Sequence, residues 1–210
     1  ARLNCAMLQG FGMTELAPVS HVTPLSSPRS GASGLAVPNT LCRIVNPDSG
    51  DDMASGEEGE LWIKGPQVMI GYLNNEQATK DTLTADGWLK TGDVAIIDKD
   101  GYMFIVDRLK ELIKYKGFQV APAELEAALV AHPKVQDAAV IGRPDEEAGE
   151  VPVAFIIALD PAPSETNIKA FIASNLSHYK QLHHVYFVDA IPKSPSGKIL
   201  RRLLRQGLSK

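Results

Sequence analysis

The most specialised segment of the chain is a loop near its end, where residues 192–198 read Pro-Lys-Ser-Pro-Ser-Gly-Lys. Two prolines and a glycine keep this loop out of a helix or a sheet interior and stiffen it before a helical segment at Ile199–Leu204. The loop presents the ammonium group of Lys198, which could stabilise negative charge that develops on a phosphate. A domain-terminal turn with a solvated lysine is the alternative.

A second segment, residues 9–15, reads Gln-Gly-Phe-Gly-Met-Thr-Glu. The glycines on either side of Phe11 let the backbone approach a flat ring, while the Thr14 hydroxyl and the Glu15 carboxylate could serve a phosphate and a magnesium ion. Nucleotide binding is one interpretation. A tight turn followed by a Thr-Glu helix start is the other, and the pattern alone does not decide between them.

A third pattern joins an aspartate to an arginine. Residues 87–93 read Gly-Trp-Leu-Lys-Thr-Gly-Asp, and Arg108 follows Asp93 by 15 residues. An aspartate at a strand start can accept two hydrogen bonds from a ribose diol, and an arginine near the same edge can anchor ribose or phosphate. A turn aspartate and a surface arginine are the alternative.

A fourth segment, residues 108–120, carries four cations within nine residues. A basic amphipathic helix that contacts a membrane or nucleic acid is one interpretation. Ile113, Tyr115 and Val120, however, alternate as in strands, with Lys116-Gly117 as a turn between them. The pattern therefore favours a strand hairpin.

Other kinds of site are disfavoured by composition and spacing. The net charge of −4 argues against a general nucleic-acid binder, and no apolar run is long enough for a membrane span. The five histidines lack metal-ligand spacing, and no Gly-x-Ser-x-Gly occurs. Cys5 and Cys42 suggest neither a disulfide framework nor a zinc site.

The elements that must position these segments change in character along the chain. Residues 1–32 read as a turn followed by a mobile, Ser/Pro/Gly-rich loop. From Gly34 to Val106, short apolar runs alternate with turn residues, which predicts a small antiparallel sheet or barrel. The predicted strands are Leu41–Val45, Glu60–Ile63, Val94–Ile97 and Tyr102–Val106.

After Asp107 the pattern becomes a mixture of helices and strands. Apolar spacing and an early proline predict a helix at Pro122–Val130, and Ser164 predicts the start of a second helix at Glu165–Leu176. The remaining predicted strands are Asp137–Ile141, Val151–Ala158 and Val185–Val188. We therefore expect an α+β fold in two parts, 1–107 and 108–210, joined by a sharp hinge.

In chain order, the four segments resemble the later signature blocks of the acyl-adenylate-forming superfamily, which includes acyl-CoA synthetases and nonribosomal peptide adenylation domains. Residues 102–126 and 187–201 look most like 4-coumarate–CoA ligases and firefly luciferase. The resemblance covers essentially the whole chain. It implies a β-rich portion of the AMP-binding domain at 1–107 and a mobile C-terminal domain at 108–210.

The resemblance also implies a role for each matching residue. Around the nucleotide, the resemblance implies that Gly10, Phe11 and Gly12 flank adenine and the acid and that Ile105 packs near adenine. It implies that Thr14 contacts phosphate and that Glu15 supports magnesium. Asp93 and Arg108 would hold the ribose. For the later step it implies Lys110 at the hinge, Lys114 and Gln119 in a second domain orientation, and Lys116-Gly117 beside the approach of coenzyme A. Lys198 would serve adenylation.

The implied activity is that of an acid–CoA ligase. Such an enzyme uses ATP and magnesium to convert a carboxylic acid to an acyl-AMP, which coenzyme A then converts to a thioester. The expected acid is 4-coumarate-like, as in phenylpropanoid metabolism, or another aryl or fatty acid. Pro18 and Val19 match positions that line the acid pocket of hydroxycinnamate ligases.

One departure from the family pattern concerns the phosphate loop. The family's early Ser/Thr/Gly-rich loop, which ends in Pro-Lys-Gly, has no match, and the chain opens at Ala1 without Met. We expect a fragment whose partner is the missing N-terminal part of the enzyme. The cytosol is the expected compartment, or the peroxisome if a leucine is missing after Ser209-Lys210.

Two alternatives to an acid–CoA ligase fit the same motifs. A luciferase-like adenylating oxygenase contains every segment discussed, so the sequence does not separate it from a ligase. The third interpretation is an inactive fragment or interaction module that folds but binds neither ATP nor coenzyme A.

Overall fold

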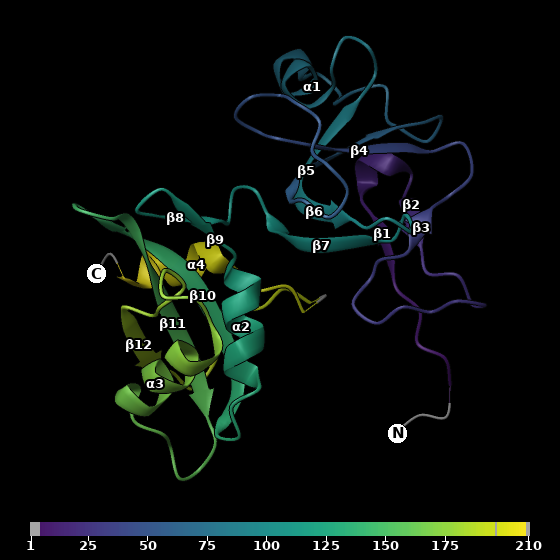
Figure 1. Cartoon of the computed structure of the whole chain (residues 1–210). Coiled ribbons are helices and arrows are strands. Elements are labelled where there is room, and N and C mark those ends of the chain that lie inside the picture. Colours follow the sequence, from purple (N-terminus) through teal and green to yellow (C-terminus); the bar gives the residue numbers. More distant parts are fainter. Residues whose placement is uncertain (1–4, 196, 209–210) are drawn as a thin grey trace. The chain divides into compact units, whose positions relative to one another are not determined.

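The chain folds into two compact units. The computed structural model describes residues 5–195 and 197–208. Unit 1 comprises Ala1–Leu109 and unit 2 comprises Lys110–Lys210, and the division lies two residues beyond the boundary expected at Asp107-Arg108 (Figure 1). Each unit has its own hydrophobic core.

The larger sheet of unit 1 is antiparallel and has four strands in the order β4-β5-β6-β7. These strands are β4 (Leu41–Val45), β5 (Gly59–Lys64), β6 (Leu89–Ile97) and β7 (Met103–Arg108). The four predicted strands are confirmed, although β6 begins five residues earlier than Val94. The sheet stays open within the described residues, since β4 and β7 form its two edges, so the barrel alternative does not form.

A second sheet in unit 1 corrects the expectation of a turn and loop at residues 1–32. It contains β1 (Gly10–Gly12), β2 (Val19–Val22) and β3 (Leu35–Ala36), with a 3₁₀ helix, η1 (Thr14–Leu16), between the first two. Glycine is depleted in strands, so Gly-Phe-Gly gives no strand signal. Pairing of Phe11 with His21 holds this segment extended instead.

Helix α1 (Glu76–Thr82) was also missed by the sequence analysis. It buries none of its residues and so lacks the apolar stripe by which helices are found. Its visible signal is the N-cap, where the Asn75 side chain accepts a hydrogen bond from the backbone N–H of Ala78 at 3.1 Å.

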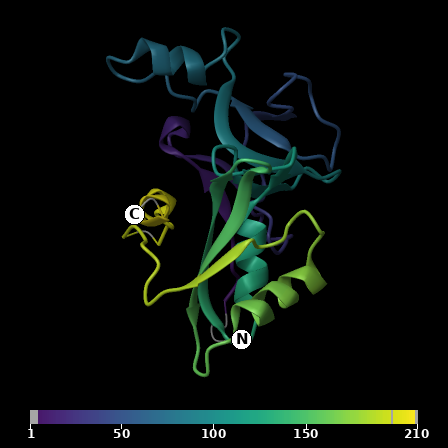
Figure 2. The ribbon, with the colours of Figure 1, turned by 90° about the vertical axis from the view of Figure 1, so that its left-hand side faces the viewer.

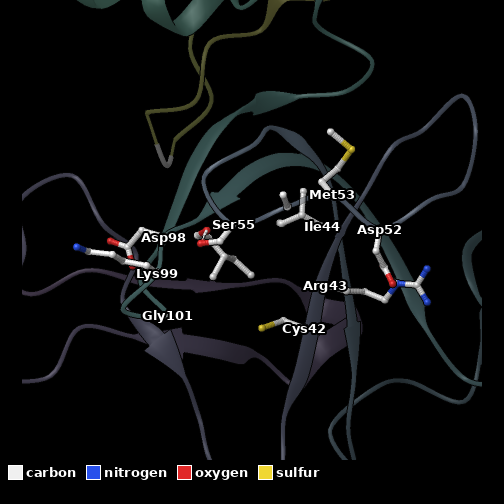
Figure 3. Close-up of a pocket in the computed structure, with 11 residues that line it drawn as sticks. Cys42, Arg43, Ile44, Asp52, Met53, Ser55, Asp98, Lys99 and Gly101 are labelled. Atoms are coloured by element: carbon white, nitrogen blue, oxygen red, sulfur yellow. Dashed lines mark hydrogen bonds and ion pairs between the residues drawn. The ribbon is translucent and has the colours of Figure 1, made fainter.

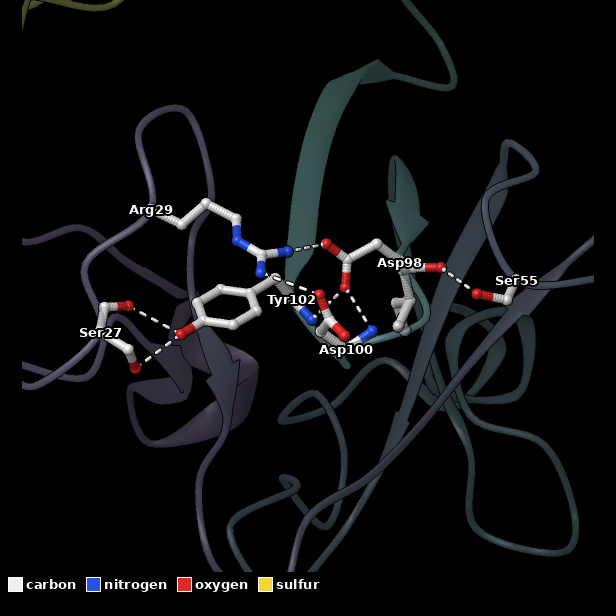
Figure 4. A network of polar contacts seen from close by, with 7 residues as sticks. Ser27, Arg29, Ser55, Asp98, Asp100 and Tyr102 are labelled. Carbon is white, nitrogen blue, oxygen red and sulfur yellow. Dashed lines mark hydrogen bonds and ion pairs between the residues drawn. The ribbon is translucent and has the colours of Figure 1, made fainter.

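The loop at residues 24–33 is tied to the turn between β6 and β7. Arg29 forms ion pairs with Asp98 and Asp100 (2.9 Å to Asp100) and lies over the ring of Tyr102, 4.0 Å from its centroid (Figure 4). The Tyr102 hydroxyl donates to the carbonyl of Ser27 at 2.7 Å. These contacts attach the loop to the four-stranded sheet.

Unit 2 is built on a sheet in the order β10-β11-β8-β9, with β12 paired in parallel to β11. The strands are β8 (Ile113–Tyr115), β9 (Phe118–Val120), β10 (Val135–Asp145), β11 (Gly149–Ala158) and β12 (His184–Phe187), and the helices are α2 (Pro122–Val130), α3 (Glu165–Asn175) and α4 (Arg201–Leu208). The elements predicted here are confirmed, including Ser164 as the cap of α3, which accepts from Asn167 N–H at 3.1 Å.

The sheet of unit 2 is covered on both faces. Alternate residues of β10 enter different cores: Ala138 and Val140 pack with α2 and α3, whereas Ala139 and Ile141 pack with Leu204 of α4. Figure 2 shows α4, in yellow, on the side of this sheet away from α2 and α3. The final helix therefore packs on its own face of the sheet.

Candidate active site

Asp93 and Arg108 are partners in the register of β6 and β7. The Nε–H of Arg108 donates to Asp93 Oδ1 at 3.1 Å. The Asp93 side chain is only 7% exposed, whereas that of Arg108 is 63% exposed. Asp93 lies inside β6 rather than at a strand start as expected, because β5 pairs with β6 from Leu89 onwards.

Buried hydrogen bonds hold the backbone of β6 at Gly92 and Asp93. The N–H of Asp93 donates to Thr91 Oγ1 at 3.1 Å, and the Thr91 hydroxyl donates to the carbonyl of Leu61 at 2.7 Å. The buried carboxylate of Glu60 accepts from the N–H of Gly92 at 3.0 Å and from the Trp62 indole at 2.7 Å. Sequence reasoning missed Glu60, whose only signal is a carboxylate inside an apolar strand.

The Gly-Phe-Gly segment forms β1 and approaches β2 closely. A Cβ atom on Gly12 would lie 1.9 Å from the carbonyl oxygen of Pro18, so only glycine fits there. Phe11 and Ile105 both pack against the core cluster that contains Leu16. The glycine segment and β7, which are far apart in sequence, thus share one core.

Glu15 lies in η1 and is held by the segment before α1. Its carbonyl accepts from Met69 N–H at 2.9 Å, and its carboxylate accepts from the Tyr72 hydroxyl at 2.8 Å. This hydrogen bond raises the pKa of Tyr72, because the phenol proton is shared with a carboxylate. Tyr72 was not among the expected site residues.

A β-bulge in β2 directs two adjacent side chains inward. Phe11 pairs with His21 and Gly12 pairs with Val19, which leaves Ser20 as the extra residue. Ser20 and His21 are both fully buried, and their side chains are hydrogen-bonded, with 3.0 Å between Ser20 Oγ and His21 Nδ1. Burial lowers the pKa of His21 to about 4, so its ring is neutral near pH 7.

Lys114 and Gln119 are directly opposite each other across the hairpin of β8 and β9. Both are exposed. Lys116 and Gly117 form the turn with φ angles of 48° and 83°, the left-handed values that a tight two-residue hairpin requires. The four residues expected on the coenzyme A side therefore occupy one hairpin.

Lys198 is exposed and lies just before α4 in a loop with internal hydrogen bonds. Ser194 N–H donates to the Lys198 carbonyl at 2.8 Å, and Lys198 N–H donates to Ser194 Oγ at 3.2 Å. Lys193 pairs with Asp137 of β10. Lys198 thus lies at the β10 edge of the sheet, whereas the hairpin that carries Lys114 forms its other end.

Comparison with known families identifies the family to which the chain belongs. Residues 1–73 match the family of AMP-binding enzymes, and residues 124–198 match the AMP-binding enzyme C-terminal domain. The chain is 51% identical over 210 residues to 4-coumarate–CoA ligase 1 of Glycine max, covering 96% of this chain and 71% of that protein. The chain belongs to the AMP-binding, adenylate-forming enzymes.

Two further relatives show how much of a family member this AMP-binding chain covers and how similar its fold is. It is 51% identical over 215 residues to 4-coumarate–CoA ligase 5 of Oryza sativa subsp. japonica, covering 98% of this chain and 39% of that protein. It resembles the ATP-bound structure of MatB from Rhodopseudomonas palustris with a TM-score of 0.91 and 32% identity, covering 98% of this chain and 41% of that one. The AMP-binding chain therefore spans about two fifths of the length of these two relatives.

A pocket of about 610 Å³ in unit 1 of this AMP-binding chain contains none of the expected site residues (Figure 3). It is open and is lined by residues of β4, the segment before β5 and the turn between β6 and β7.

Among the described residues, no group of three or more histidine, cysteine or acidic side chains is arranged to hold a metal ion. No helix in the described part is both long and apolar enough to cross a membrane.

Proposed function

We propose that this chain is the C-terminal part of an ATP-dependent acid–CoA ligase that forms an acyl-AMP and then an acyl-CoA thioester. The main support is the Asp93–Arg108 pair, found in a chain that is about half identical to named 4-coumarate–CoA ligases. The missing N-terminal part would supply the phosphate loop and most of the acid pocket. The free thiols Cys5 and Cys42 suit the reducing cytosol, where we propose that the enzyme works.

Unit 1 would hold the nucleotide. The buried carboxylate of Asp93 has the acceptor capacity for a ribose diol, and the exposed guanidinium of Arg108 can donate to ribose or phosphate. Gly10, Phe11, Gly12 and Ile105 would flank adenine and the acid, and Thr14 would contact phosphate. The observation that supports these roles is that Phe11 and Ile105 pack against the same hydrophobic core.

Magnesium would enter with the phosphates of ATP. Magnesium commonly keeps several waters and is held by one or two carboxylates together with substrate phosphates. A single partly exposed carboxylate at Glu15, positioned by Tyr72, fits such a shared ion better than a closed protein site. When bound, the ion would neutralise charge on the phosphates that react.

Lys198 would act in the first half-reaction. Attack by a carboxylate on the α-phosphorus concentrates negative charge, and an ammonium group held at that point stabilises the transition state more than the ground state. Loss of one such donor costs roughly 3–4 kcal/mol, by analogy with an oxyanion-hole donor. The lysine would be an electrostatic clamp rather than a nucleophile.

The β8–β9 hairpin would act in the second half-reaction. Lys114 and Gln119 are opposite each other and exposed, so one ligand could contact both side chains. The backbone of Lys116-Gly117 would line the approach of coenzyme A, and Lys110 would lie at the hinge between the two domain orientations. Lys114 and Lys198 would serve different steps.

We propose a 4-coumarate-like acid as the substrate. The support is the activity for which the relatives are named, together with the exposure of Pro18 and Val19, which follow η1. Acid-dependent exchange of pyrophosphate into ATP, measured in the full-length enzyme with 4-coumarate, caffeate and a medium-chain fatty acid, ranks these classes directly.

The test of this function uses the full-length enzyme that contains this chain. Acid-dependent exchange of pyrophosphate into ATP reports the first half-reaction, and thioester formation from a supplied acyl-AMP reports the second. We expect Lys198→Ala to slow the exchange by hundreds-fold and to leave the second reaction within about twofold. Unchanged exchange in the variant would contradict the role of Lys198, and absence of exchange in the wild type with every acid would contradict the ligase assignment.

A further inference from the structure

The hydrogen bonds inside the Lys198 loop fix its shape but not its position. Ser194 accounts for the local bonds, through its backbone, its hydroxyl and the N–H of Gly197, which donates to the Ser194 carbonyl at 2.9 Å. All of these bonds lie within the loop and would move with it. A second set of contacts must attach the loop to the rest of unit 2.

The most buried attachment is an ion pair between Glu126 of α2 and Arg201, the first residue of α4. One guanidinium nitrogen, Nη2, donates to both carboxylate oxygens, at 2.7 and 2.8 Å. The same two side chains bind one backbone unit: Glu126 Oε1 accepts from Val140 N–H at 2.8 Å, and Arg201 Nε–H donates to the Val140 carbonyl at 3.2 Å. We call Glu126, Arg201 and the backbone of Val140 the edge clamp.

The edge clamp joins the two faces of the sheet. Val140 belongs to β10, which forms one edge of the sheet, so among the described residues no strand pairs with its outward N–H and carbonyl. Helix α2 lies on one face of the sheet and α4 lies on the other (Figure 2). Glu126 and Arg201 therefore meet around the edge and satisfy both backbone groups.

Burial separates the edge clamp from the other ion pairs near the loop. The side chains of Glu126 and Arg201 are 14% and 16% exposed, against 25% and 41% for Glu111 and Arg205 one turn further along α4, and 29% and 36% for Asp137 of β10 and Lys193 of the loop itself. Charges this well shielded are weakly screened by salt and are held in one geometry by several hydrogen bonds. Such a pair can define a position, whereas an exposed pair is free to rearrange.

Arg201 follows Lys198 by three residues. The intervening Leu200 donates its N–H to the Pro192 carbonyl at 2.8 Å, which ties the end of the loop to its beginning. We propose that the edge clamp positions Lys198 for the adenylation half-reaction, an inference that rests on the proposed function of Lys198. Glu126 and Arg201 are positioning residues, since they act through the loop.

A positioning role for the edge clamp predicts a different result from a general contribution to the stability of unit 2. A displaced ammonium group loses its effect steeply with distance, so a loosened loop slows acyl-AMP formation. Thioester formation from acyl-AMP would use the β8–β9 hairpin and not Lys198. The edge clamp therefore affects one half-reaction, whereas general loss of unit 2 stability affects both.

Two conservative substitutions weaken the edge clamp. Arg201→Lys keeps the positive charge but loses the planar guanidinium that contacts both Glu126 and Val140. Glu126→Gln keeps an acceptor for Val140 N–H but loses the charge. Arg205→Lys is the matched control, because it makes the same change one turn along the same helix at a more exposed pair.

The first measurement uses the 210-residue chain itself and needs no activity. Nuclear magnetic resonance order parameters report the motion of the Gly197 and Lys198 amides, and we expect them to fall by about 0.2 in Arg201→Lys and Glu126→Gln but not in Arg205→Lys. Unchanged order parameters in both clamp variants would overturn the inference.

The second measurement uses the full-length enzyme. We expect either clamp variant to lower the maximal rate of acid-dependent pyrophosphate exchange by about tenfold to a hundredfold and to leave thioester formation from acyl-AMP within about twofold. An equal fall in both half-reactions would assign the pair a structural role only and overturn the inference. If the wild-type enzyme shows no exchange, the proposed function fails, and the order parameters still decide whether the edge clamp holds the loop.

Discussion

Arg108 covers the carboxylate of Asp93 from the solvent side, with its Nε–H on Asp93 Oδ1 at 3.1 Å. The two residues are register partners on adjacent strands, yet the aspartate is buried and the arginine is largely exposed. A buried carboxylate with an exposed cation above it is suited to a polar ligand that enters between solvent and sheet. We expect a ribose to interact with both groups.

Asp93→Asn tests this pair in the full-length enzyme. The amide keeps the shape of the carboxylate but loses the charge that strengthens its hydrogen bonds, which is a loss of about 1.5–3 kcal/mol. We expect the KM for ATP in pyrophosphate exchange to rise about tenfold to a hundredfold, with a smaller effect on the KM for the acid.

The matched control for Asp93→Asn is Asp98→Asn. Asp98 lies just beyond the end of β6, five residues after Asp93 in the sequence, and pairs with Arg29. Its substitution should leave the KM for ATP within about twofold, since its partner is in the loop at residues 24–33. Equal KM values for wild type and Asp93→Asn would remove Asp93 from the nucleotide site.

Substitution of Lys114 or Gln119 by alanine should affect the other half-reaction. The two side chains are opposite each other in β8 and β9, at the far end of the sheet from β10 and the Lys198 loop. We expect thioester formation from acyl-AMP to fall by about tenfold or more, because loss of a charged or polar ligand contact costs roughly 1.5–3 kcal/mol. Pyrophosphate exchange should stay within about twofold.

The control for the hairpin variants is Lys80→Ala, which removes an exposed lysine of α1 that pairs with Glu76 at 3.8 Å. An exposed pair of this kind contributes little, so neither half-reaction should change. The assignment of the hairpin to the second step would be wrong if Lys114→Ala slowed exchange as much as it slowed thioester formation.

Much of unit 2 was predictable because its signals are local. The helix at Pro122–Val130 is found from its apolar spacing and early proline, and α3 is found from its Ser164 cap. The hairpin was predicted from alternation around Lys116-Gly117, and those two residues take the positive φ angles that the turn requires. Each of these signals acts over a few residues.

Unit 1 was less predictable because its elements depend on distant pairing. Residues 10–12 form a strand only through β2, and β6 begins at Leu89 because β5 supplies partners there. Around the candidate site, Asp93 and Arg108 were found from residue type and spacing. Glu60, Tyr72 and the edge clamp were missed, since each depends on contacts between residues far apart in sequence.

Gly12→Ala should destabilise unit 1 through backbone overlap. The new methyl group would lie 1.9 Å from the Pro18 carbonyl oxygen and 3.0 Å from Val19 Cα, and neither atom belongs to a flexible side chain. Overpacking of this kind costs about 1–3 kcal/mol or more. Urea unfolding of the 210-residue chain, followed by tryptophan fluorescence from Trp62 and Trp88, measures the loss.

The matched control for Gly12→Ala is Gly10→Ala, in the same strand. Its added methyl group would meet the His21 carbonyl oxygen at 3.2 Å, a contact that a small shift relieves. We expect Gly10→Ala to cost clearly less than Gly12→Ala. Equal losses would show that β1 and β2 are not in the close contact described.

The buried ring of His21 should make unit 1 sensitive to acid. Burial lowers its pKa to about 4 in the folded state, whereas an unfolded histidine has a pKa of about 6.5. Well above pH 6.5 the ring is neutral in both states and has no effect on the pH dependence. As the pH falls from 6.5 to 4, the unfolded state binds a proton that the folded state excludes, so stability declines by up to about 3 kcal/mol and then levels off.

Urea unfolding of the 210-residue chain between pH 7 and pH 4 measures this decline, and His21→Gln isolates the contribution of the one ring. Glutamine keeps a polar group for Ser20 but does not titrate, so the variant should lose less stability between pH 6.5 and pH 4 than the wild type does.

His132→Gln is the control, because His132 is a partly exposed histidine in unit 2. This variant should keep the wild-type pH dependence in the unfolding of unit 1. Parallel pH profiles for wild type and His21→Gln would mean that the His21 ring takes up its proton in the folded state, in a more polar environment than the bulge in β2 provides.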